Sequence, residues 1–309
     1  MAGYNSGWTN YASGGFSPSM LAVRCKEVID ALHRSGIRPS VPNRITRAID
    51  IVTGLNDSER LAQASASDLH VGSEAFRTLW EFFFIGYTYR ERGRPGGPFT
   101  TERLGAIFDG ADTAATDANS RARSLQFELY TASALVLSGA DVIDGEPDIR
   151  FLYHGEYRGV AVKRVQTLSR NAVRNAVRDG IRQIRGSCRT GFVALNLDTR
   201  VGDLDTAGDA SALGKSFNTA VEDARETIED YSDREVFLGA MLYGTHFEWI
   251  VDRTPPLLAF HMPRQVRCFT VTDDDVERAR AFFEPAQVRL GNALTDICRL
   301  VSRSQANPR

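Results

Sequence analysis

The chain has 309 residues, of which 42% are hydrophobic and 25% are charged, so it has the composition of a folded globular protein long enough for two domains. Its formal net charge of −2 excludes a uniformly basic nucleic-acid binder, and any basic surface must be local. The cysteines, Cys25, Cys188, Cys268 and Cys298, are too far apart for the paired spacing of a zinc finger and fit a reducing cytoplasm.

Residues 1–18 are rich in Gly, Ser, Tyr and Asn and lack the basic and apolar regions of a signal peptide. We therefore predict a flexible or loosely packed arm at this end. Residues 79–87 form an apolar and aromatic run, but Glu81 interrupts it and it is far shorter than the ~20 residues that span a bilayer. The sequence thus predicts a core helix there and no membrane segment.

Residues 19–117 have the pattern of a helical N-terminal domain. A first helix is predicted over residues 18–35, a second after the break at Pro42, and one or two more over residues 65–92. The Arg-Pro-Gly-Gly-Pro segment at residues 94–98 is the clearest linker in the chain. We predict a domain boundary there or just after Asp117, and we take residues 118–309 as the second domain.

The second domain is predicted to begin with a helix over residues 119–138. Leu125, Ala132 and Leu135 line one apolar stripe of this helix, and Glu128 is the single acid on that stripe. Burying a lone carboxylate is costly unless a partner neutralises it. That partner is either one of the many arginines, in an internal salt bridge, or a metal ion or lysine supplied by the strands that follow.

Residues 148–163 have the period-two pattern of two strands joined by a hairpin. In the first strand, Ile149 points to one face of the sheet, so Asp148 points to the other. In the second strand, Val162 and Lys163 likewise point to opposite faces. If the apolar residues of both strands share a face, Asp148 and Lys163 meet across the hairpin, where neighbouring strands lie ~4.8 Å apart. A carboxylate and an ammonium group side by side can hold a divalent cation and an attacking water.

Lysine is rare in this chain. Of the 37 lysines and arginines only three are lysines, namely Lys26, Lys163 and Lys215. Arginine is effectively always protonated, whereas a buried lysine can shift its pKa and serve as a compact donor or proton-transfer group. Lys163 in an apolar strand therefore indicates a chemical role, the alternative being a strand-end lysine whose ammonium group reaches solvent.

These residues resemble the core motifs of the PD-(D/E)xK nuclease superfamily, the restriction-endonuclease-like proteins. Glu128 resembles the helix glutamate, Pro147-Asp148 the PD element, and Lys163 the lysine of the last motif. They also occur in the expected order, on helix, strand, strand and helix. One position departs from the pattern, because Ala161 stands where the superfamily has an acid two residues before the lysine.

The local candidates to replace the missing acid are Glu146, Glu156 and Gln166, and their spacing favours none of them. Glu146 belongs to a short acidic run with Asp144 and Asp148, a pattern typical both of a divalent-cation site and of a solvated turn. The resemblance as a whole covers residues 124–186.

The resemblance implies an α/β fold with a restriction-endonuclease-like core, in which helix, strand, strand, helix and strand build a mixed sheet flanked by helices. The last of these strands is the buried run at residues 191–197. Beyond it we expect a polar loop at residues 199–213 and an acidic helical stretch at residues 215–231. Strands are then predicted at residues 236–243, 247–252, 257–261 and 266–271, followed by a closing helix or helix pair over residues 273–302 with an interruption near Pro285.

The helix predicted over residues 169–185 carries arginines at strict four-residue steps, namely Arg170, Arg174, Arg178 and Arg182. Four guanidinium groups in one row repel each other unless anions lie between them. With Arg164 nearby, this arginine row is a candidate phosphate-binding surface for nucleic acid. The alternative is a solvated face that acids from elsewhere in the chain balance.

Gln183 lies on the same helix, in line with the small residues Ala176 and Gly180, and is therefore expected to point back toward the sheet. Nucleases of the superfamily often place a glutamine on the helix after the lysine. By resemblance, Gln183 is a candidate catalytic residue that orders Lys163 or a nearby phosphate.

Other chemistries leave no signature in the sequence. The histidines show no HExxH or paired spacing for a zinc hydrolase, no GxxxxGK[ST] or GxGxxG element is present to bind a nucleotide, and no GxSxG elbow marks a nucleophilic serine.

The resemblance implies a metal-dependent nuclease that hydrolyses phosphodiester bonds, and DNA is the first candidate substrate of such an endonuclease. It also implies a role in host defence, in the cytoplasm. Glu128 and Asp148 would hold Mg²⁺ or Mn²⁺, and Lys163 would orient the attacking water or stabilise charge at phosphorus. The N-terminal helical domain would recognise DNA, a protein partner or a second copy of the chain. The rival interpretation is a catalytically weak or inactive module that binds DNA through the same fold, and a third is a structural subunit of a larger complex.

Overall fold

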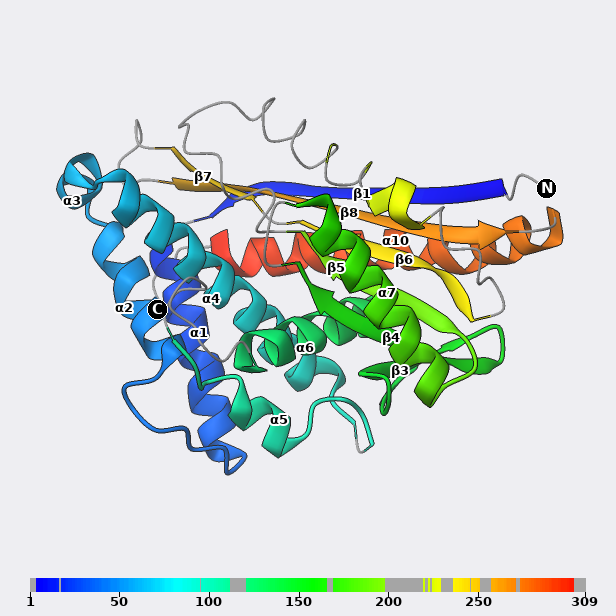
Figure 1. Ribbon diagram of the computed structural model, residues 1–309. Helices are drawn as coiled ribbons and strands as arrows, with labels where there is room; N and C mark the ends of the chain where they lie inside the picture. The colour runs from blue at the N-terminus through cyan, green and yellow to red at the C-terminus, as the bar shows by residue number, and fades with distance from the viewer. Residues whose placement is uncertain are drawn as a thin grey trace.

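The structure is a computed structural model, and it describes residues 4–16, 18–94, 96–111, 121–165, 169–197, 219, 222, 224–228, 236–244, 246–250, 257–270 and 273–302. Within these residues, eight strands form one mixed sheet with helices packed on both of its faces (Figure 1). None of the helices described there has the length and the hydrophobicity of a transmembrane span.

Helices and strands alternate irregularly along the described residues. In chain order the helices are α1 (Pro18–Arg34), α2 (Arg44–Leu55), α3 (Ser58–Gln63), α4 (Ala66–Arg92), α5 (Thr101–Ala106), α6 (Arg121–Leu137), α7 (Arg170–Ser187) and α10 (Asp273–Ser302). The strands are β1 (Tyr4–Phe16), β2 (Val142–Asp144), β3 (Ile149–Tyr153), β4 (Glu156–Arg164), β5 (Gly191–Asn196), β6 (Phe237–Tyr243), β7 (His246–Ile250) and β8 (Leu257–Thr270).

The sheet has the strand order β1-β8-β6-β5-β4-β3-β2, with β7 also paired to β8. Strands β2, β3 and β4 are antiparallel neighbours, β4, β5 and β6 run parallel, and β6, β8 and β1 are again antiparallel. Because a parallel pair needs a crossover connection, α7 links β4 to β5 and packs on both. The predicted α/β class, with a mixed sheet flanked by helices, is confirmed. Along the chain, α6, β3, β4, α7 and β5 occur in the predicted order, with the short strand β2 between α6 and β3.

The side chains of β4 alternate between two hydrophobic cores on opposite faces of the sheet. Val160 and Val162 join the core that also contains Ile149, whereas Ala161 joins the core under α7. Because every second side chain of a strand points to the same face, Lys163 lies on the α7 side together with Ala161. The alternation that the sequence predicts for this strand is confirmed.

Helix α7 approaches the sheet through Gly180. A Cβ atom at this position would lie 2.8 Å from Cγ2 of Val193 and 3.5 Å from Cβ of Ala161. The first of these distances is shorter than real Cβ contacts, so the absence of a side chain permits the close packing. The remaining buried residues of α7 are Val173, Val177, Ile181 and Ile184.

The N-terminal helices pack directly on the α/β part of the chain. Phe84 of α4 contacts Tyr130 of α6, with ring centroids 5.0 Å apart, and Phe127 of α6 contacts Tyr243 of β6 at 5.6 Å. One contiguous hydrophobic core includes residues of α1, α2 and α4 together with residues of α6, the sheet and α10. The domain boundary predicted after Asp117 therefore does not separate two hydrophobic cores.

A buried polar network also joins the two parts. Oε2 of the buried Glu81 accepts a hydrogen bond of 2.6 Å from Gln126, and Oε1 lies 3.5 Å from the guanidinium group of Arg164. The buried Arg44 donates to the side chain of Gln126 and, at 2.8 Å, to the carbonyl oxygen of Ile107. Buried charges are tolerated only when they are paired, so this network holds α2, α4, α6 and the end of β4 in one arrangement.

Two predictions about the outer strands are wrong. The flexible arm predicted at residues 1–18 is, over its described part, mostly strand β1, which runs antiparallel to β8 from Tyr4 opposite Thr270 onward. The strands predicted at residues 257–261 and 266–271 are one continuous strand, β8. Backbone N–H and C=O groups at a sheet edge pair with another extended segment whatever its side chains, so side-chain patterns give little warning of such strands.

One helix prediction needs a smaller correction. Residues 273–302 contain the single helix α10, which continues through Pro285 without the predicted interruption. Residues 65–92 contain the single helix α4, in agreement with the one or two helices predicted there. The polar loop predicted at residues 199–213 lies outside the described residues. The helical prediction for residues 215–231 is confirmed where the structure describes them.

Candidate functional site

The β3–β4 hairpin brings Asp148 and Lys163 together. Asp148 directly precedes β3, and the register of the hairpin pairs Ile149 with Val160. Nζ of Lys163 lies 3.9 Å from Oδ2 of Asp148. The backbone N–H of Val162 donates a hydrogen bond of 2.6 Å to the same oxygen, so the aspartate is anchored to the strand that carries the lysine.

Gln183 joins this pair from α7, the helix that packs on β4 and β5. Its Oε1 atom accepts a hydrogen bond from Nζ of Lys163, while its Nε2 atom donates to Oδ1 of Asp148 at 3.0 Å and to the carbonyl oxygen of Pro147 at 2.6 Å. One amide therefore orients both the ammonium group and the carboxylate. Gln183 lies one helical turn beyond Gly180, on the face of α7 that touches the sheet, as the sequence predicts.

Glu128 approaches the same group from α6. Its side chain is 21% exposed, and its pKa is raised to about 7, first because burial disfavours the charged form and then because the carboxylate of Asp148 repels it. The positive charges of Arg103 and Lys163 act in the opposite direction. The pKa of Asp148 is also raised, above all by burial, although Lys163 lowers it. The structure thus brings the predicted site residues of three elements within electrostatic reach of one another.

Arg103 of α5 is a site residue that the sequence did not reveal. Its guanidinium group lies 2.8 Å from Oε2 of Glu128 and also pairs with Asp144. Of the two partners left open for Glu128, an arginine is therefore present in direct contact. No spacing or motif distinguishes Arg103 from the many other arginines, because it belongs to the N-terminal helical region and meets Glu128 only through the packing of α5 against α6.

Glu128 and Asp148 offer a donor set for a hard divalent cation. In the part of the chain that the structure describes, no three His, Cys, Asp or Glu side chains come together as a metal-binding group, so the set consists of these two carboxylates. Mg²⁺ is commonly held by one or two carboxylates, while waters and substrate phosphates complete its coordination. A cation between the two carboxylates would also relieve their mutual repulsion. The residues therefore fit Mg²⁺ or Mn²⁺.

The structure narrows the search for the missing acid. Ala161 is fully buried beneath Gly180, so this position is closed to solvent. Glu156 lies at the far end of β4, where it pairs with Arg158. Glu146 is exposed and close enough to raise the pKa of Asp148, so it remains a candidate. Gln166, the third candidate, lies outside the described residues.

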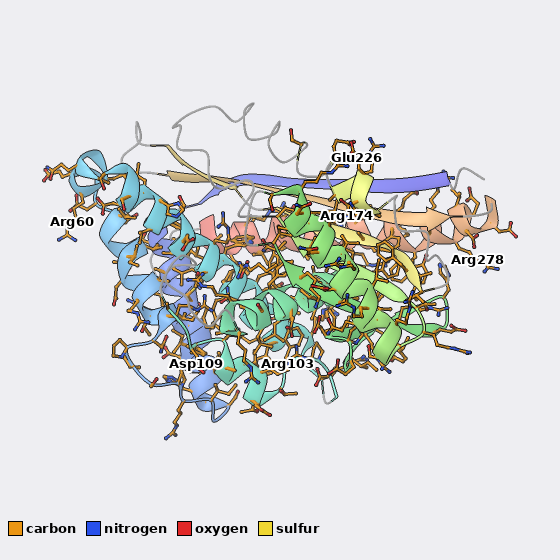
Figure 2. All side chains as sticks on the ribbon, in the orientation of Figure 1. Arg60, Arg103, Asp109, Arg174, Glu226 and Arg278 are labelled. Atoms are coloured by element: carbon orange, nitrogen blue, oxygen red, sulfur yellow. The ribbon has the colours of Figure 1, made fainter. Side chains whose placement is uncertain are left out.

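The arginine row is exposed along α7, as predicted, and Arg174 is labelled on this helix in Figure 2. Arg170 pairs with Glu226, and Arg182 lies 3.2 Å from Asp179 on its own helix. Arg178 donates a hydrogen bond of 2.9 Å to Asn175. Nearby side chains thus balance part of the charge, but all four guanidinium groups remain accessible to an anionic ligand.

Arg164, which the sequence analysis adds to the candidate phosphate-binding surface beside the arginine row, is turned into the interior instead. Its side chain is only 15% exposed and pairs with Glu81, and its guanidinium group donates at 3.2 Å to the carbonyl oxygen of Arg123. The alternation of β4 explains the difference, since Arg164 follows Lys163 and so points to the opposite face of the sheet. Arg164 is therefore part of the buried polar network around Glu81 and not of the exposed surface of α7.

Comparisons with known proteins add no relative. A scan against protein-family models found no match, and searches of curated proteins and of solved structures found none either. The functional conclusions therefore rest on the geometry of the site and on the motifs in the sequence.

Introducing an acid at position 161, where the superfamily pattern has one, should destabilise the protein. We expect Ala161→Asp to lower the free energy of unfolding by about 3 kcal/mol, because the carboxylate enters a fully buried position under α7. Asn175→Asp introduces the same side chain at an exposed position of α7 and should change it by less than about 0.5 kcal/mol. Chemical denaturation measures both, and an Ala161→Asp protein as stable as the wild type would contradict this account of the packing.

The raised pKa of Glu128 predicts how stability depends on pH. Because the folded-state pKa of about 7 lies above the ordinary value of 4.5, the contribution of Glu128 to folding is complete below 4.5 and is lost as the pH rises through 7. Glu128→Gln cannot ionise, so without metal its melting temperature should increasingly exceed that of the wild type from about pH 5 to about pH 8. Thermal unfolding across this range checks the prediction, and parallel curves for the two proteins would refute it.

Proposed function

We propose that the chain is a divalent-metal-dependent nuclease with a restriction-endonuclease-like core, and that it hydrolyses phosphodiester bonds in DNA. The observation that carries this proposal is the convergence of Glu128, Asp148, Lys163 and Gln183 from α6, the β3–β4 hairpin and α7. These residues match the superfamily's motifs in type and in order. A chance resemblance of short motifs would not require their side chains to meet.

The chemistry of the site supports hydrolysis of a phosphodiester. A divalent cation held by Glu128 and Asp148 would polarise the scissile phosphate and lower the pKa of a bound water. Lys163 is held in one place by Gln183 and by its charge interaction with Asp148, so its ammonium group can orient that water or stabilise negative charge at phosphorus. Gln183 acts by positioning, because it bonds to both charged groups of the hairpin.

The arginine row supports a nucleic-acid substrate. From Arg170 to Arg182 the row spans about 18 Å of helix at ~1.5 Å per residue. Gln183 directly follows Arg182 in the chain, so the row ends beside the site. A polyanion lying along α7 would therefore reach the cluster around Lys163, and backbone phosphates are bound in this way without regard to base sequence.

The roles of the N-terminal helices and the cellular setting are proposals of the same kind. We take α1 to α4 to recognise DNA, a protein partner or a second copy of the chain, because α4 packs on α6, the helix of Glu128, and none of the four supplies a predicted site residue. Cytoplasmic host defence is the setting that the resemblance to restriction-endonuclease-like proteins favours.

Two observations favour a second function. Ala161 replaces an acid, and the described residues contain no three-ligand metal-binding group. A chain with the same fold could therefore bind DNA through α7 without cutting it. The two functions differ in whether plasmid DNA is cleaved in the presence of Mg²⁺ or Mn²⁺.

Substitutions at Lys163 and Gln183 test the nuclease. Lys163→Ala should reduce plasmid cleavage by about 10³-fold, because a group that stabilises the transition state is lost. Gln183→Ala should reduce it by about 10-fold to 100-fold, as expected for a residue that orients others. Both variants should still shift DNA in a gel.

Gly186→Ala is the matched control on α7, because a Cβ atom there meets nothing within 4 Å, and it should cut like the wild type. If the wild type shifts DNA but never cuts it, the binding module is the correct function. If the wild type neither cuts nor shifts DNA, the remaining interpretation is a structural subunit of a larger complex.

The arginine row predicts a specific dependence of DNA binding on salt. The double variant Arg174→Ala/Arg178→Ala should bind more weakly, and the slope of log K against log salt should become shallower by about 0.9 for each lost phosphate contact. Arg280→Ala/Arg299→Ala removes the same charge from exposed positions of α10 and should leave the slope unchanged. Anisotropy titrations of a short duplex at several salt concentrations measure this, and equal slopes for all three proteins would exclude α7 as the binding surface.

A further inference from the structure

Arg103 reaches the candidate site from outside the nuclease-like core. It is labelled in Figure 2 and lies on α5, in the segment between the N-terminal helices and α6. The guanidinium group is 16% exposed and lies between two carboxylates, with 2.8 Å to Oε2 of Glu128 and a second contact to Asp144. Asp144 is 44% exposed, so the better-shielded of the two contacts is the one to Glu128.

This contact involves a carboxylate group that a metal ion would need. Glu128 and Asp148 are the carboxylates proposed to hold the divalent cation, and Arg103 occupies one oxygen of Glu128. An arginine side chain stays protonated at any pH of interest, so it is a permanent positive charge at this position. A hydrogen bond between a guanidinium group and a carboxylate is also among the stronger ones in proteins.

We infer that Arg103 competes with the divalent cation for Glu128 and thereby sets the metal affinity of the site. This inference rests on the proposed function, since it assumes that Glu128 is a metal ligand. When a cation binds Glu128 and Asp148, it displaces the guanidinium group from Oε2 of Glu128. Asp144 then remains as the partner of Arg103, so the displaced charge is not left without a counterion. Metal binding is in this way linked to the side chain of Arg103 on α5.

The opposite role would give the opposite result. If Arg103 only held Glu128 in the right orientation for the metal, its removal would weaken metal binding. If it competes, its removal strengthens metal binding, both because an oxygen of Glu128 is released and because a repelling positive charge is gone. The direction of the change therefore decides between the two roles.

The test is a calorimetric titration with Mn²⁺ in the absence of DNA. Arg103→Gln should bind Mn²⁺ about tenfold more tightly than the wild type, the factor expected when one charge-assisted hydrogen bond no longer has to be broken. Arg103→Lys keeps the charge but loses the planar fork, so its affinity should lie between the two. Its melting temperature, and that of Arg103→Gln, report whether the variants fold.

Arg94→Gln is the matched control. Arg94 pairs with Asp141 on one flank of β2, much as Arg103 pairs with Asp144 at the end of the same strand, but it does not contribute to the pKa of Glu128. It removes the same charge and should change the Mn²⁺ affinity by less than about twofold, because solvent and salt screen an exposed pair. In a Glu128→Gln background, Arg103→Gln should increase the affinity less than it does in the wild type, because only the loss of the repelling charge remains.

The possible results separate the inference from the proposed function. If the wild type binds Mn²⁺ through Glu128, and Arg103→Gln binds it equally or more weakly, the inference is overturned and the metal site stands. Binding that appears only after Arg103→Gln supports the inference in its strongest form. If neither protein binds Mn²⁺, the metal site fails and the inference fails with it.

Discussion

The pleat of the β3–β4 hairpin is the constraint on which the site depends. Both faces of β4 are covered, one by the core that includes Val162 and the other by the core under α7. Each side chain of β4 therefore points to one of the two faces. If the pairing of Ile149 with Val160 slipped by one residue, the side chain of Lys163 would point to the face opposite α7. The burial of apolar neighbours thus holds the lysine in place opposite Asp148, and the hydrogen bond from Val162 fixes that aspartate.

Charge balance is the second constraint. The site contains two partly buried carboxylates whose pKa values are raised, and two cations, Lys163 and Arg103, that oppose this rise at Glu128. Such a group brings charges of both signs into one partly buried place, and pKa values in such places differ from ordinary ones. The cations come from different parts of the chain: Lys163 from the hairpin and Arg103 from α5. The electrostatics of the site therefore involve the N-terminal helical region as well as the core.

In the interior too, the N-terminal helical region makes polar contacts with the α/β part of the chain. Glu81 of α4 receives hydrogen bonds or ion pairs from Gln126 of α6 and from Arg164 of β4, two residues that are sequence neighbours of the site residues Glu128 and Lys163. Together with the shared hydrophobic core, this network makes the helices a support for the site and not an independent attachment. The segment at residues 94–98, rich in proline and glycine, therefore does not separate two hydrophobic cores. The composition of a segment reflects its local backbone preferences and does not show which elements pack against each other.

The sequence by itself determined the local features of this protein. Alternation placed Asp148 and Lys163 on one face, helical spacing put Gln183 toward the sheet and the arginine row toward solvent, and the apolar runs predicted most helices and the inner strands, because these patterns record burial within one element. Only the tertiary structure decided which elements meet. It paired Arg103 with Glu128, buried Arg164 against Glu81, and joined β1 to β8, because ion pairs and sheet edges link residues far apart in the chain whose own neighbours carry no trace of the contact.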